Sequence, residues 1–159
     1  MAATYNNLYL DARKRLREAG VEGAQLEARE LVCCAAGKSR EQFYRDMALY
    51  ASDPVEEKLA ELLERRLAGE PVAYLIGEWE FYGLGLDITP DVLIPRMDTE
   101  VLAERAILLA RAAGEGARVL DLCAGSGCVG LAVAANVPGC RVVLADVSEA
   151  ALRLCKQNV

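Results

Sequence analysis

The chain has 159 residues, of which 53% are hydrophobic and 26% are charged, and this composition excludes a disordered tail. The formal net charge of −6, from 18 basic and 24 acidic residues, argues against broad electrostatic binding to nucleic acid or to an anionic membrane. Histidine is absent, so the chain lacks the usual proton shuttle near neutral pH and the commonest zinc ligand.

The cysteines and the chain's hydropathy indicate a reduced, cytoplasmic protein. Two cysteines are adjacent and the other four show no CxxC spacing: Cys33, Cys34, Cys123, Cys128, Cys140 and Cys155. We therefore expect no metal site, and we expect Cys123 and Cys128 to be small fillers beside a glycine turn. The N-terminus lacks the apolar core of a signal peptide, and no apolar run approaches the ~20 residues of a membrane span.

Residues 4–69 have apolar side chains three and four positions apart, which predicts several short helices. The clearest start signal is Asp53 as a cap, with Pro54 at the first helical position and Glu56 completing a capping box. Such helices most simply pack into a bundle over residues 1–75. The alternative is that they decorate the N-terminus of one larger domain.

After Glu78 the apolar pattern alternates instead of following a helical period, which predicts a β-hairpin. We assign residues 76–96 to this hairpin as a linker. A further helical stripe then begins the third part of the chain, residues 97–159.

The third part continues with an apolar strand at residues 119–122, a glycine-rich turn, a helix from about Val129 and a second strand at residues 141–145. This order of strand, helix and strand predicts an α/β fold with a parallel sheet and a right-handed crossover.

The glycine-rich turn is the strongest chemical signal in the sequence. Gly125 and Gly127 allow backbone to come close to a bound group, and the next helix directs its amides and positive dipole end into the same crevice. Asp146 follows Gly125 by twenty-one positions, close to the ~20-residue interval at which an acid binds a ribose diol. Alternatively, Asp146 caps the final helix, jointly with Ser148 and Glu149.

The same glycines, with Gly130, also match the GxGxxG pattern of dinucleotide sites. Asp121 argues against that assignment, because a carboxylate at the end of the strand would repel a pyrophosphate. It would attract a cationic ligand such as S-adenosylmethionine (SAM).

Three segments together resemble the PrmC/HemK family, the glutamine methyltransferases of peptide chain release factors: GEWEFYGLGLDITPDVLIPRMDTE, VLDLCAGSGCVGLAVA and LADVSEAAL. The resemblance runs from the hairpin to the end of the chain, and the preceding helices fit the family's N-terminal bundle. It implies a helical bundle, a β-hairpin linker and the first β-α-β part of a Rossmann-like SAM-dependent methyltransferase domain.

The resemblance also implies roles for individual residues. It places the cofactor loop at five consecutive residues: Cys123, Ala124, Gly125, Ser126 and Gly127. Asp121 matches the acid at the strand end, and Asp146 matches the acid that binds the ribose hydroxyls. Four residues match the segment beside the active site: Arg96, Asp98, Thr99 and Glu100. Met97 departs from the proline usual in the family, and the segment is also typical of ordinary helix initiation, with Asp98 or Thr99 as the cap.

The implied activity is SAM-dependent methylation of the side-chain amide of the glutamine in the GGQ motif of release factors, with the helical bundle holding the protein substrate. The family's catalytic NPPY string does not occur in the 159 residues. We therefore expect no catalytic residue in this chain and little methyl transfer by the chain alone.

Three other functions stay open: methylation of a ribosomal-protein glutamine, docking of release factor without turnover, and an NAD-binding oxidoreductase. Strands that expect burial on both faces also indicate a truncated domain. We expect such a domain to be poorly ordered or to self-associate.

Overall fold

The computed structural model describes residues 3–159 in two compact units, the first ending at Ile76 and the second spanning Gly77–Val159. Among the described residues, none of the helices combines the length and the apolar composition that a membrane crossing requires.

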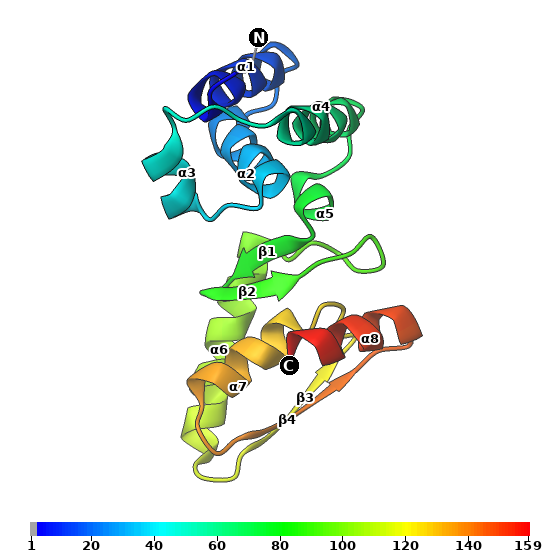
Figure 1. The fold of residues 1–159 in the computed structure, drawn as a ribbon. Helices are drawn as coiled ribbons and strands as arrows, with labels where there is room; N and C mark the ends of the chain where they lie inside the picture. The colour runs from blue at the N-terminus through cyan, green and yellow to red at the C-terminus, as the bar shows by residue number, and fades with distance from the viewer. Residues whose placement is uncertain (1–2) are drawn as a thin grey trace. The chain divides into compact units, whose positions relative to one another are not determined.

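The first unit is helical, as the periodicity predicted (Figure 1). Its helices are α1 (Tyr5–Glu18), α2 (Ala24–Ala36), α3 (Arg40–Asp46), α4 (Asp53–Leu67) and α5 (Val72–Ile76). Helix α2 lies at the centre of the unit, since α1, α3, α4 and α5 all contact it. Its apolar face is buried at Ala28, Leu31 and Val32, where the small Ala28 side chain permits close helix approach.

The capping box predicted at the start of α4 is wrong. Ser52 is the N-cap residue, and Asp53 already belongs to the helix. The Ser52 carbonyl accepts from the amides of Val55 and Glu56, while the Glu56 carboxylate accepts from the backbone N–H of Ala3 at 2.9 Å. The Glu56 side chain is thus used in a tertiary contact 53 positions away, which local sequence spacing does not reveal.

The second unit begins with the predicted hairpin, formed by β1 (Glu78–Phe81) and β2 (Leu84–Asp87). The strands are antiparallel, and Phe81 pairs with Leu84 across a two-residue turn. The remaining elements are α6 (Met97–Ala113), β3 (Arg118–Leu122), α7 (Cys128–Asn136), β4 (Arg141–Ala145) and α8 (Glu149–Asn158).

Strands β3 and β4 pair in parallel around α7, so the predicted β-α-β unit is confirmed. One face of this sheet is covered: Val119 and Val142 pack against a buried cluster that includes Ile107 of α6 and Val133 of α7. The register pairs Leu122 with Ala145, so both strands end at the same edge of the sheet. The residues that follow the two strands are therefore neighbours.

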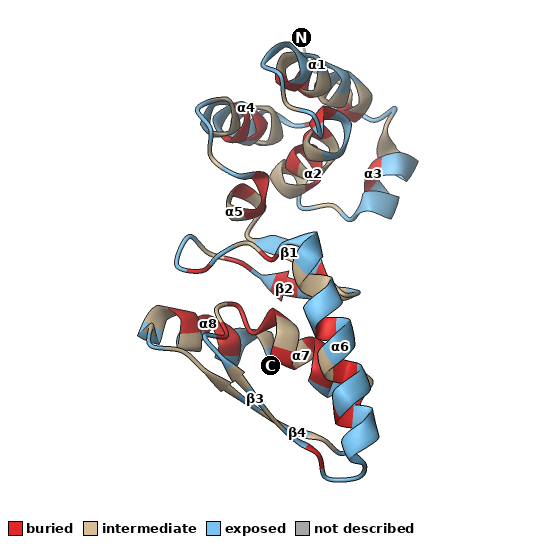
Figure 2. Ribbon diagram, turned by 180° about the vertical axis from the view of Figure 1, so that it is seen from behind, coloured by how far each residue is buried: buried red, intermediate tan, exposed pale blue. Residues whose placement is uncertain are grey.

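Within the described part of the second unit, the opposite face of the sheet is exposed, and Figure 2 shows α7 and α8 together on the other side of the strands. Leu120 is 63% exposed, Leu122 70% and Val143 58%. Since side chains alternate between the faces of a strand, these three share one surface. We call Leu120, Leu122 and Val143 the open face.

Close packing of α7 on the sheet depends on Gly130. A Cβ atom at this position would lie 2.2 Å from Leu144 Cδ2 and 3.1 Å from Val142 Cγ1. The first distance requires the Leu144 side chain or the helix to move, and the second requires a small adjustment of Val142.

We expect the 159-residue protein to self-associate through the open face, because apolar side chains of this size rarely remain in water on a parallel sheet. Light scattering across a concentration series should show association that the Leu120→Lys/Leu122→Lys variant reduces. Leu109→Lys, at a 72% exposed position on α6, is the control. A wild-type protein that stays monomeric at high concentration would contradict this expectation.

Gly130→Ala should destabilise the second unit by about 1–3 kcal/mol through overpacking against Leu144. Urea denaturation monitored by circular dichroism measures the loss. The same substitution should cost less in a Leu144→Val background, where the δ-methyl groups are gone. Equal costs in the two backgrounds would show that this contact does not explain the glycine.

Candidate cofactor-binding site

The turn after β3 brings its backbone amides to the shared edge of the sheet. Three of its residues have left-handed backbone conformations, with φ of 63° at Cys123, 56° at Gly125 and 83° at Gly127. Cys123 is exposed, so the expectation that it fills space in the turn is wrong, whereas Cys128 is buried as expected. For Cys123 the left-handed conformation costs roughly 1–2 kcal/mol, which the surrounding hydrogen bonds must offset.

The two glycines of the turn meet different surroundings. A Cβ atom at Gly125 would find open space, so there is room there for a bound group. At Gly127 it would lie 3.1 Å from Leu144 Cδ1 and 3.3 Å from Cys155 Sγ. Gly125 therefore has the open space that close approach of a ligand requires, whereas Gly127 faces the packed interior. Ala124 and Ser126, between and beside them, are buried.

Asp146, which follows β4, is bonded to the turn. Its Oδ2 accepts from the Gly125 N–H at 2.9 Å, and its Oδ1 accepts from the Ser148 N–H at 2.9 Å. The side-chain cap of α8 is Ser148, whose Oγ accepts from the Ala151 N–H, so Asp146 does not cap the helix itself. The Val147 N–H also bonds to this carboxylate. Since a carboxylate has about four acceptor positions, capacity remains for one further donor.

Asp121, near the end of β3, is directed to the start of α7. Its Oδ2 accepts from the Gly130 N–H at 2.8 Å, in the first turn of the helix. The carboxylate therefore holds an N-terminal amide that a phosphate would otherwise bind. This arrangement disfavours a pyrophosphate against the turn and leaves negative charge facing any ligand there.

The two carboxyl groups have opposite pKa shifts. Burial raises the pKa of Asp121, partly countered by the Gly130 N–H, and the charge of Asp146 raises it further. The N–H groups of Ser148 and Gly125 lower the pKa of Asp146. The lowered pKa favours the ionised form of Asp146. The raised pKa disfavours the ionised form of Asp121, which a nearby cation would stabilise.

Helix α8 contributes two side chains to the turn that the sequence analysis missed. Cys155 Sγ donates to the Gly125 carbonyl at 3.1 Å, and Asn158 Nδ2 donates to the Ser126 carbonyl at 3.0 Å. The available signal was the spacing of Ala151, Leu154, Cys155 and Asn158, which places a polar amide on the inward stripe of the helix.

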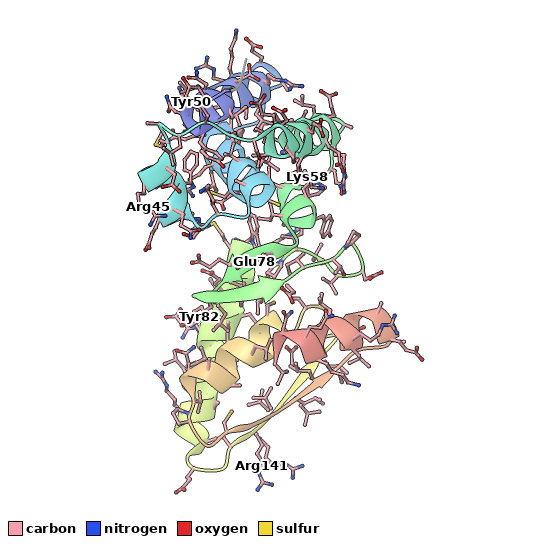
Figure 3. The ribbon with its side chains drawn as sticks, viewed as in Figure 1. Arg45, Tyr50, Lys58, Glu78, Tyr82 and Arg141 are labelled. Carbon is pink, nitrogen blue, oxygen red and sulfur yellow. The ribbon has the colours of Figure 1, made fainter. Side chains whose placement is uncertain are left out.

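The segment predicted beside the active site starts α6. Arg96 is the N-cap residue and no side chain caps the helix, so the alternative with Asp98 or Thr99 as the cap is wrong. Glu100 Oε1 instead accepts from the N–H of Tyr82 at 3.0 Å. Tyr82, labelled at the hairpin in Figure 3, lies in the hairpin turn and has a φ of 50°. The described contacts of Glu100 thus hold the hairpin on α6 and do not connect it to the glycine turn.

The opposite shifts predict that the Asp121 carboxyl titrates above the ordinary Asp pKa and the Asp146 carboxyl below it, as measured by carboxyl ¹³C NMR. Asp146→Asn should therefore lower stability at pH 7, with the difference disappearing as the pH falls through the native pKa of Asp146. Asp121 should have the opposite effect on stability, because a raised native pKa favours folding at low pH. Asp121→Asn should therefore leave stability at pH 7 unchanged or higher. The reverse order of the two pKa values would contradict the described hydrogen bonds.

Two family models match the chain: the PrmC N-terminal domain at residues 7–77 and a lysine methyltransferase at residues 95–159. The second match covers both carboxylates and the whole turn.

Proteins named release factor glutamine methyltransferase are similar over most of the chain. That of Bordetella pertussis is 45% identical over 140 residues, 84% of this chain and 49% of the relative. That of Coxiella burnetii is 40% identical over 134 residues, 84% of this chain and 48% of the relative. That of Vibrio cholerae is 36% identical over 158 residues, 99% of this chain and 54% of the relative.

The chain spans about half the length of these curated relatives. Within that span, the helical unit matches one family model and the β-α-β unit with its glycine turn matches the other. The chain belongs to the PrmC/HemK family of release factor glutamine methyltransferases.

Proposed function

We propose that this chain forms the SAM-binding half-site and the substrate-holding helical unit of a protein-glutamine methyltransferase that acts on peptide chain release factors. The observation that carries the proposal is the arrangement of two carboxylates at one edge of the sheet. Asp146 accepts from the Gly125 N–H in the glycine turn, and Asp121 accepts from the Gly130 N–H in the first turn of the following helix. The names of the relatives support the substrate.

The residues of the turn suit SAM by their chemistry. The free acceptor capacity of Asp146 fits the ribose hydroxyls, and the shielded carboxylate of Asp121 fits the positive charges of the sulfonium and ammonium groups. The open side of Gly125 leaves room for the ligand. Cys123, Ala124, Ser126 and Gly127 complete the loop.

When bound, SAM supplies a methyl group on a positively charged sulfur. The acceptor would be the side-chain amide nitrogen of the GGQ glutamine. In the family, NPPY holds that amide in line, and this string does not occur in the 159 residues. The contribution of this chain is binding and orientation. Arg96, Thr99 and Glu100, at the start of α6, are proposed to lie beside the substrate.

Two other functions are less well supported. A ribosomal-protein glutamine methyltransferase would need the same cofactor turn, but the relatives that match are named for release factors. An NAD-binding oxidoreductase would place a pyrophosphate where the Asp121 carboxylate already accepts from the Gly130 N–H. We place the methyltransferase in the cytoplasm, where its release-factor substrates act.

Calorimetric titration of the 159-residue protein tests the cofactor. SAM should bind more tightly than NADH, and Asp146→Ala should weaken SAM binding by about tenfold or more, because the ribose loses a charged acceptor. Glu149→Ala, at an exposed carboxylate three positions along, is the matched control. Preferential binding of NADH, or SAM binding unaffected by Asp146→Ala, would reject the proposed site.

A radiolabelled methyl-transfer assay tests the activity. The 159-residue protein should show little transfer, whereas a fusion to the NPPY-containing half of a relative should methylate a GGQ-bearing protein. Loss of the label when the GGQ glutamine is replaced identifies the acceptor. A fusion that binds SAM but methylates a ribosomal protein in preference would select the alternative substrate.

A further inference from the structure

We propose that Asn158 is a positioning residue, which sets the orientation of the Ser126 peptide in the cofactor turn and couples that turn to the β-hairpin. The proposal rests on the proposed function for the role of the turn, but its central contacts do not involve a ligand. All of them lie within the second unit.

The Asn158 carboxamide makes three hydrogen bonds to backbone groups. Its Oδ1 accepts from the Asp87 N–H at 2.8 Å, and its Nδ2 donates to the Asp87 carbonyl at 3.1 Å and to the Ser126 carbonyl at 3.0 Å. A carboxamide has two N–H donors, so both are used, one for the hairpin and one for the turn. A single rigid group therefore joins two backbone segments.

At the hairpin, Asn158 takes the place of a neighbouring strand. The Ile88 N–H donates to the Gly77 carbonyl at 2.9 Å, toward the β1 side. Because successive residues of a strand alternate in direction, the N–H and carbonyl of Asp87 point to the outer edge. The carboxamide pairs with both of these groups, as the backbone of an added strand would.

At the turn, α8 holds two successive carbonyls. Cys155 and Asn158 are three positions apart and share one side of the helix. Cys155 binds the Gly125 carbonyl and Asn158 binds the Ser126 carbonyl. Ser126 is only 2% exposed, so water is a poor substitute for the side-chain donor.

The conformations beside Ser126 make this anchoring necessary. Gly125 and Gly127 both have positive φ, and glycine adopts either sign of φ at little cost. Two contacts therefore fix the Ser126–Gly127 peptide against rotation: its N–H donates to the Ala124 carbonyl, and its carbonyl accepts from Asn158. The Asn158 donor selects the orientation in which the carbonyl faces α8.

The contacts continue from the hairpin to α6. The Tyr82 N–H in the hairpin turn donates to Glu100, in the segment that the family resemblance places beside the active site. Asn158 thus connects the cofactor turn, through the hairpin, to the proposed substrate side. By linkage, a ligand that orders the turn should also stabilise the Asp87 contact.

Two substitutions in the 159-residue protein separate the two contacts. Asn158→Ala removes all three hydrogen bonds. Asn158→Asp keeps an acceptor for the Asp87 N–H but replaces the donors with oxygen, which repels the carbonyls of Ser126 and Asp87. Gln157→Ala, an exposed amide one position earlier, is the matched control. Far-UV circular dichroism shows whether each variant is folded.

Amide hydrogen exchange measured by NMR reports on each end of the connection. The Asp87 N–H reports on the hairpin, and the Gly127 N–H, which donates to the Ala124 carbonyl at 2.7 Å, reports on the turn. Asn158→Ala should speed exchange at both sites by about tenfold or more. Asn158→Asp should speed it as much at Gly127 but less at Asp87, whose N–H keeps its acceptor. The control should change neither. Unchanged exchange at Gly127 in both Asn158 variants would overturn the proposal.

Calorimetry with SAM tests the functional consequence. Both Asn158 variants should bind SAM at least about fivefold more weakly than wild type, and SAM should slow Asp87 exchange in wild type but not in Asn158→Ala. Wild-type affinity in folded Asn158→Asp would overturn the positioning role. A wild-type protein that does not bind SAM would reject the proposed function, whereas the ligand-free exchange at Gly127 would still decide the role of Asn158.

Discussion

The site depends on the parallel pairing of β3 and β4, which ends both strands at one edge of the sheet. Asp121 and Asp146 lie at that edge, and each binds one backbone amide of the turn and helix between the strands. A shift of the strand register would separate both carboxylates from these amides. The pairing of β3 with β4 therefore holds the backbone of the turn in place.

The surroundings of the two acids give them different electrostatic properties. Asp146 is held by backbone N–H groups, which lower its pKa, whereas burial raises the pKa of Asp121. Placing like charges close together costs stability, and a cationic ligand would reverse that cost. We therefore expect the pair to favour a positively charged cofactor. Asp121, which lies in β3 and accepts from the Gly130 N–H in the first turn of α7, disfavours a pyrophosphate there.

Dense packing and open surface occur on opposite sides of the same small sheet. Beneath α7 there is no room for one methyl group at Gly130, whereas Leu120, Leu122 and Val143 remain open to water. The covered side gives the turn a rigid support, and Cys155 and Asn158 of α8 reach it from that side. The open face accounts for the expected self-association.

Sequence alone determined the helical first unit, the hairpin, the β-α-β order and the family, because these follow from short-range periodicity and a contiguous motif. It also placed Asp121 and Asp146 correctly at strand ends and Gly125 in the turn between the strand and the helix, since parallel strands share an edge. Tertiary structure decided the partners: Glu56 binds Ala3, Glu100 binds the hairpin, and Asn158 binds Asp87 from 71 positions away. Such hydrogen bonds join residues that are distant in sequence, so no local pattern encodes which polar group a side chain will meet.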